Sequence, residues 1–108
     1  MSSFLFAFHQ PPGPLSPAQA DALMAKGQVW LEGIARSVTG PLTPLGKSVW
    51  LGCDGADANE TPAPLAGFMI VEAQTVEHVV DMASSSPHLD VGGIIEIAPV
   101  LDLDFNSA

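Results

Sequence analysis

Two strand-length segments, each apolar on both faces and interrupted by one glutamate, constrain the fold most strongly. They are residues 67–73 (GFMIVEA) and 94–101 (IIEIAPVL). Successive side chains of a strand point to opposite faces, so one face of each segment is wholly apolar and the other carries Glu72 or Glu96. A sheet of such strands has to be covered on both faces. We expect helices on one face and, most simply, the same sheet of a second copy on the other.

The N-terminal part of the chain predicts a strand followed by a helix. Residues 3–9 (SFLFAFH) form a short aromatic run that ends in the turn cluster QPPGP, as strands often do. Ser16 and Gln19 are spaced for a capping box, which predicts a helix from there to about Arg36. Gly27 lies on the apolar stripe of this helix and costs about 1 kcal/mol relative to alanine. We therefore expect the helix to approach a sheet closely at Gly27.

The middle of the chain predicts weaker elements. Residues 37–44 are extended but contain prolines, which only an edge strand tolerates. Residues 47–52 (KSVWLG) fit a strand better, and residues 53–66 predict a long loop without regular structure. Thr75 is a suitable N-cap for a second helix, which ends at the sequence SSSPHLD.

The predicted order of elements, β-α-β(β)-β-α-β, is that of the split βαβ or ferredoxin-like fold. The sequence thus indicates an α+β protein with an antiparallel sheet, and its length fits one domain over residues 1–108. The acidic tail from about residue 102 is expected to fray.

Composition excludes several classes of function. Hydrophobic residues make up 47% of the chain and charged residues only 14%, which favours burial of apolar surface in a homodimer. The net charge is −9 and the three basic residues are scattered, so nucleic acid and anionic membranes are poor partners. The apolar run at the N-terminus is too short for a signal peptide. We predict a cytoplasmic protein without a cofactor.

The C-terminal half resembles the YCII-related family, which includes the DGPF-domain proteins. The family pattern combines a glycine, a strand ending in an acidic residue, a capped helix, a proline corner, a glycine pair and a final strand. The matching residues are Gly67, Phe68, Glu72, Thr75, Pro87, Gly92, Gly93, Glu96 and Pro99. The resemblance implies a dimeric α+β barrel in which two sheets pack face to face around a cavity.

The chain departs from the family at three points that concern activity. Ala98 replaces the arginine that precedes the last proline, and the Asp-Gly-Pro-Phe motif is absent from residues 53–66. A histidine and an acid on the first helix are the proposed active-site pair of shorter members. Here Gln19 or a neighbour takes the histidine position, and only Glu32 could replace the acid. That chemistry is therefore not transferred to this chain.

The corner SSSPHLD contains serines 84–86, His88 and Asp90 but does not predict a Ser-His-Asp triad. A triad needs the three side chains folded onto one another, and the backbone between these residues is too short. The nucleophile-elbow motif G-x-S-x-G is also absent. We expect these serines to satisfy free carbonyls at the end of the helix.

His9, Glu72 and Glu96 form the candidate site. Taking the first strand as parallel to the strand of Glu72 and antiparallel to that of Glu96, we expect all three side chains to meet on the cavity side. Such a cluster could act as an acid–base pair, with these three residues as the hypothetical catalytic groups. It could also bind a ligand without chemistry, hold a divalent metal or form only a structural network. We assign no metal to it.

Two further residues are candidates for ligand binding, namely His88 just before the last strand and Trp50 in residues 47–52. The structural interpretation is favoured for both, namely a surface corner for His88 and a core or interface position for Trp50. Three functions remain open: a small-molecule binder in the barrel cavity, a small lyase, isomerase or cofactor-free oxygenase, and a structural or regulatory partner protein. The first is the favoured interpretation.

Overall fold

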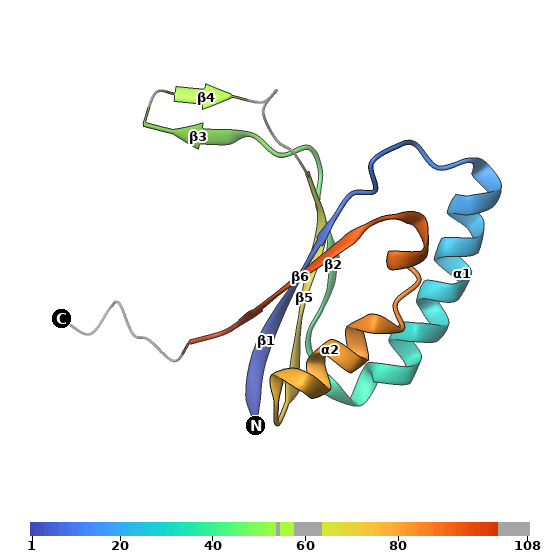
Figure 1. The fold of residues 1–108 in the computed structure, drawn as a ribbon, viewed down its shortest axis with the longest axis vertical. Coiled ribbons are helices and arrows are strands. Elements are labelled where there is room, and N and C mark those ends of the chain that lie inside the picture. Colours follow the sequence, from blue (N-terminus) through green and yellow to red (C-terminus); the bar gives the residue numbers. More distant parts are fainter. Residues whose placement is uncertain (54, 58–63, 102–108) are drawn as a thin grey trace.

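The chain folds into a four-stranded antiparallel sheet with two helices on one face (Figure 1). The computed structural model describes residues 1–53, 55–57 and 64–101. The sheet has the strand order β2-β5-β1-β6, which is the ferredoxin-like arrangement predicted from the sequence. Its strands are β1 (Ser2–His9), β2 (Val38–Pro44), β5 (Leu65–Ala73) and β6 (Ile94–Pro99). The predicted fraying from about residue 102 lies outside the described residues.

The two helices cover the sheet face that carries the aromatic residues of β1. Helix α1 (Pro17–Ile34) begins at Ser16 with both hydrogen bonds of the capping box, and α2 (Val76–Ser84) begins at Thr75, whose hydroxyl accepts from the His78 amide. A 3-10 turn (Ala35–Ser37) connects α1 to β2. The core between helices and sheet consists of Phe4, Phe6, Phe8, Met69, Val71, Ala73, Val79, Met82 and Ala83.

The direction of the strands corrects one expectation. Strand β1 is antiparallel to both β5 and β6, whereas the sequence analysis took β1 and β5 as parallel. The two crossover helices make β1 parallel to β2 and β5 parallel to β6, as a βαβ connection requires. The connection from β2 to β5 reverses the chain, because these neighbours pair antiparallel. Strand β1 therefore runs opposite to both of its neighbours.

Strand β2 is the edge strand that the prolines in residues 37–44 predicted. It pairs with β5 through two register shifts, and Pro41 lies within the second of them. The close pairing depends on Gly67 of β5, because a Cβ atom there would lie 2.9 Å from the main-chain oxygen of Thr43. This contact gives a physical reason for a glycine at the start of the GFMIVEA segment.

Residues 47–57 differ from the prediction. The strand expected over 47–52 is reduced to β3 (Trp50–Gly52), which pairs with β4 (Gly55–Asp57) in a separate hairpin. The hairpin projects from the sheet on the side opposite the helices (Figure 1). Residues 53–66 therefore contain regular structure at both ends, since β5 already begins at Leu65. Gly52 pairs with Gly55, and Gly55 has a positive φ of 108°, which glycine adopts without steric cost.

Helix α1 is not held close to the sheet at Gly27, contrary to the sequence expectation. A Cβ atom at Gly27 would meet nothing within 4 Å, and no residue of α1 is buried. Trp30 instead bridges the gap: its Nε1–H donates a hydrogen bond of 3.0 Å to the Met82 oxygen, and its ring stacks on Phe6 at 6.5 Å. The helix is thus supported at Trp30 and stands away from the sheet around Gly27.

Candidate ligand-binding site

His9 and Glu96 are in direct contact on the sheet face opposite the helices. The His9 Nε2 atom and the Glu96 Oε1 atom are 2.9 Å apart. In the antiparallel pairing of β1 with β6, Glu96 lies opposite Ala7. His9 is two residues further along β1 on the same face, within diagonal reach of a long side chain. The bulky phenylalanines of β1 alternate toward the core, which leaves His9 on the other face.

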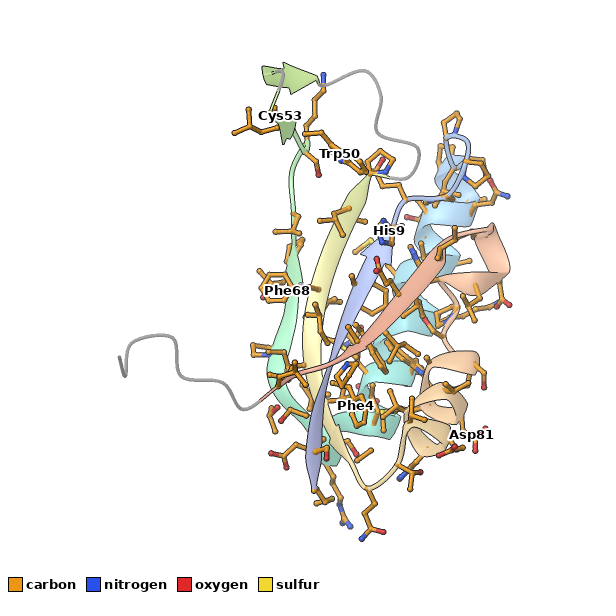
Figure 2. The ribbon with its side chains drawn as sticks, turned by 60° about the vertical axis from the view of Figure 1, so that its left-hand side comes forward. Phe4, His9, Trp50, Cys53, Phe68 and Asp81 are labelled. Carbon is orange, nitrogen blue, oxygen red and sulfur yellow. The ribbon has the colours of Figure 1, made fainter. Side chains whose placement is uncertain are left out.

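The His9–Glu96 pair borders an apolar hollow. We call it the open-face hollow, and it has a volume of about 360 Å³. Its walls come from β1, β5, β6 and the β3–β4 hairpin, and the residues are Leu5, Ala7, His9, Trp50, Leu65, Glu96 and Ala98. Trp50 reaches this hollow from the hairpin, near His9 at the end of β1 (Figure 2). The structure thus brings together His9, Glu96 and Trp50 of the predicted ligand-binding residues.

Glu72 does not join this cluster, which corrects the predicted three-residue site. It pairs with Ser3 at the opposite end of β1, while His9 pairs with Leu65. Six residue steps separate Ser3 from His9, or about 20 Å along a strand. The error follows directly from taking β1 and β5 as parallel. Within the described residues, no three His, Cys, Asp or Glu side chains gather as a metal site would require.

The face that holds the open-face hollow carries further apolar side chains without a covering helix. Both helices lie on the other side of the sheet (Figure 1), and Phe68 points away from them (Figure 2). Ile94 is 54% exposed, and Trp50 is 50% exposed. In the single chain the Glu96 side chain is also 67% exposed, whereas that of His9 is 17% exposed. A contact between a histidine and a carboxylate that is exposed in this way contributes little to stability, so fold stability alone does not explain the pair.

His88 lies on the helix side of the sheet, not at the open-face hollow. Its Nε2 atom is 2.6 Å from the main-chain oxygen of His9, and its ring packs edge-on against Phe8 at 5.4 Å. A carbonyl oxygen only accepts hydrogen bonds, so His88 carries a proton on Nε2. His88, a candidate ligand-binding residue, therefore does not line the open-face hollow, although its ring is bonded to the main chain of His9.

The glycine pair before β6 has two separate structural roles. Gly92 adopts a left-handed conformation (φ 83°) and ends the short 3-10 turn Leu89–Val91, a position that strongly favours glycine. A Cβ atom at Gly93 would overlap the His88 ring. The turn therefore requires Gly92, and the packing of His88 requires Gly93. In the sequence the two glycines were recognised only as part of the family pattern.

The serine corner acts as a helix terminus, as predicted. The Ser84 hydroxyl donates to the Asp81 oxygen at 2.8 Å, and the Ser85 hydroxyl donates to the Met82 oxygen at 3.1 Å. Both acceptors are carbonyls in the last turn of α2. Ser86 is different because it is 4% exposed and its Oγ atom accepts from the His88 amide at 3.3 Å.

A second hollow, which the sequence analysis missed, lies between α1 and the sheet. We call it the helix groove, and its volume is about 380 Å³. Its walls include Leu23, Gly27, Trp30 and Leu31 of α1, Leu42 of β2, and the buried Ser86. The only sequence signal for it was the glycine on the apolar stripe of α1. That signal indicates space beside the helix as readily as close approach.

The strand order and the two helices on one face define a ferredoxin-like α+β protein. No protein-family model matches the chain, and no curated protein matches it either. A solved structure with a similar fold is 5-chloro-2-hydroxyhydroquinone dehydrochlorinase (TftG) from Burkholderia phenoliruptrix AC1100 in complex with 2,5-dihydroxybenzoquinone. The match has a TM-score of 0.54 and 22% sequence identity, covering 87% of this chain and 90% of that chain. This likeness shows a shared fold.

None of the described helices is both long and apolar enough to cross a membrane.

Proposed function

We propose that the protein binds a small hydroxylated aromatic molecule in the open-face hollow, and that a second copy of the chain closes the site. The observation that carries the proposal is the 2.9 Å contact between His9 and Glu96 at the border of an apolar hollow. A few convergent polar groups in a mainly apolar hollow of this volume are typical of small-molecule sites. The complex of TftG with 2,5-dihydroxybenzoquinone, a planar hydroxylated six-membered ring, supports the choice of a ligand of this size and shape.

The chemistry of the walls favours a flat molecule with hydroxyl groups. A ligand hydroxyl can donate to a carboxylate oxygen of Glu96, which only accepts when ionised. The imidazole of His9 provides the complementary donor or acceptor. Leu5, Ala7 and Ala98 offer an apolar floor, and the Trp50 ring offers a stacking surface.

A second copy is part of the proposal because the open face has no cover in the single chain. Face-to-face packing of two sheets would bury this apolar surface and exclude water from the His9–Glu96 pair. Exclusion of water strengthens the electrostatic interaction of the pair. The homodimer and the ligand are thus linked: each helps to remove the same apolar surface from water.

The experiment uses hydroquinone under nitrogen as the probe and follows its binding by NMR titration of amide resonances. We expect shifts at Leu5, Ala7 and Ala98, and a loss of at least fivefold in affinity for Glu96→Ala, because a charged hydrogen-bond partner is removed. Glu72→Ala is the matched control, since it removes a carboxylate from the same face at the other end of β5, and we expect no change.

Sedimentation equilibrium on the same samples should give a dimer. Equal affinities for the Glu96 and Glu72 variants, or a monomer that binds hydroquinone as tightly as any dimer, would overturn the proposal.

A second candidate function is acid–base catalysis by the same pair, and the direct contact of an imidazole with a carboxylate favours it. The elimination performed by a dehydrochlorinase removes a proton and a chloride ion from the substrate, and the pair offers an acceptor for the proton. The test is release of chloride from 5-chloro-2-hydroxyhydroquinone, with His9→Ala as the inactive variant. If the protein binds hydroquinone but releases no chloride, the catalytic function is rejected and only the binding function is retained.

A further inference from the structure

We infer that the helix groove is a second ligand site, separate from the open-face hollow, which takes a neutral aromatic molecule with one hydrogen-bond acceptor. The groove lies on the opposite side of the sheet from His9 and Glu96, between α1 and strands β2 and β5. Its volume of about 380 Å³ falls in the usual range for small-molecule sites.

The groove is space that the fold leaves unfilled. Its longest wall is α1, in which no residue is buried. Gly27 lines the groove, yet a Cβ atom added there would have no neighbour within 4 Å. The apolar walls of the groove lack packing partners across it, and a ligand would supply those dispersion contacts.

The walls select an aromatic ligand. Phe8, Trp30 and His88 contribute three rings to the groove, and Leu23, Leu31 and Leu42 contribute aliphatic surface. The three rings are held in fixed relative positions, because Trp30 and His88 each meet Phe8 edge-on, at 6.2 Å and 5.4 Å. Fixed rings favour a planar ligand, since offset stacking and edge contacts then require no rearrangement.

Ser86 supplies the polar group that orients the ligand. It is 4% exposed and lines the groove. Its Oγ atom accepts from the His88 amide at 3.3 Å, while its own proton has no acceptor in the part of the chain that the structure describes. Two partly buried ring donors at the groove are used within the protein, by Trp30 to the Met82 oxygen and by His88 to the His9 oxygen.

The absence of charge in the described walls makes the ligand neutral. No Lys, Arg, Asp or Glu residue lines the groove, and an unpaired charge would be costly to bury there. The exposed Gln28 also borders the groove, but the buried donor there is the Ser86 hydroxyl, which matches a carbonyl or ether oxygen of the ligand. The neutral aromatic ketone 2-acetylnaphthalene has this chemistry, and 2-ethylnaphthalene has a similar shape without the acceptor.

The test compares these two probes by NMR titration with the full chain. Wild-type protein should bind both, with shifts at Gly27, Gly67 and Ser86 and none at Ala7 or Ala98. Ser86→Ala should weaken the ketone about fivefold, the usual effect of one neutral hydrogen bond, and change the hydrocarbon less than twofold.

Gly27→Leu provides an independent variant that fills the groove. It should weaken both probes more than tenfold without lowering the melting temperature, because leucine favours the helix and meets no atom at the first side-chain position. Gly33→Leu is the matched control, since Gly33 lies in the same helix, also has open space and does not line the groove.

Three results would overturn the inference. The first is that the wild-type protein does not bind the ketone. The second is that the wild type and Gly27→Leu bind the ketone with equal affinity. The third is that the amide shifts are confined to residues of the open-face hollow. An effect of Ser86→Ala that is the same for both probes would remove the assigned role of the hydroxyl.

Discussion

The imidazole of His88 donates a hydrogen bond of 2.6 Å to the main-chain oxygen of His9. The two rings belong to opposite sides of the sheet: His9 reaches Glu96 on the open face, and His88 packs against Phe8 on the helix side. The corner after α2 is thereby attached to the last residue of β1. The position of the His9 ring therefore depends on a residue that does not enter the open-face hollow.

His88→Phe should destabilise the protein by about 1–2 kcal/mol. The phenyl ring can keep the edge contact with Phe8, but the His9 oxygen loses a partly buried hydrogen-bond donor. The midpoint of urea unfolding measures the effect. His78→Phe, on the exposed side of α2, should change stability by less than about 0.5 kcal/mol. Equal midpoints for the two variants would show that the hydrogen bond contributes nothing.

Gly93→Ala should destabilise the protein by about 1–3 kcal/mol, because the new methyl group overlaps the His88 ring. Thermal unfolding followed by circular dichroism measures the loss. Gly13→Ala is the control, since no atom lies within 4 Å of its new Cβ position. The double variant Gly93→Ala/His88→Ala should cost less than the sum of the two single variants, because the clash disappears. Strict additivity would contradict the assigned contact.

Trp30→Phe should cost about 1 kcal/mol, because the Met82 oxygen loses its donor while most of the ring packing on Phe6 and Phe8 remains. Urea unfolding again measures the change. Trp50→Phe is the matched control in the exposed hairpin, and its effect on stability should be below about 0.5 kcal/mol. A larger loss for Trp50→Phe would mean that the hairpin contributes more to folding than α1 does.

Val79→Ala and Val80→Ala compare two adjacent positions of α2. Val79 is fully buried in the core, whereas Val80 is 49% exposed. Removal of two buried methyl groups should cost about 2 kcal/mol at Val79, and the change at Val80 should stay within about 0.5 kcal/mol. Chemical denaturation measures the free energy of unfolding of both variants. Equal losses at Val79 and Val80 would show that α2 is not docked on the sheet.

Local signals were sufficient to predict the sheet and both helices. The capping box at Ser16 and the N-cap at Thr75 act within one turn of chain, so they can be recognised without tertiary information. The alternation of phenylalanines in β1 likewise places His9 on the face away from the helices. These features depend only on residues that are close together in the sequence.

The site needed information that local signals do not contain. Glu72 and Glu96 occupy equivalent places in their own strands, and only the direction of each strand relative to β1 separates them. The helix groove depends on how far α1 stands from the sheet, which Trp30 sets by contacting α2. Strand β4 and its pairing with β3 were missed because a strand of three residues carries too little periodicity to recognise.

The prolines of β2 determine how this molecule can associate with itself. A sheet edge with free N–H groups is a template for further strands and a frequent origin of aggregation. Pro41 and Pro44 have no N–H group to donate to a further strand, and the register shifts in the pairing of β2 make its edge irregular. Extension of the sheet across β2 into a continuous polymer is therefore disfavoured, and stacking on the open face is left as the less hindered form of self-association.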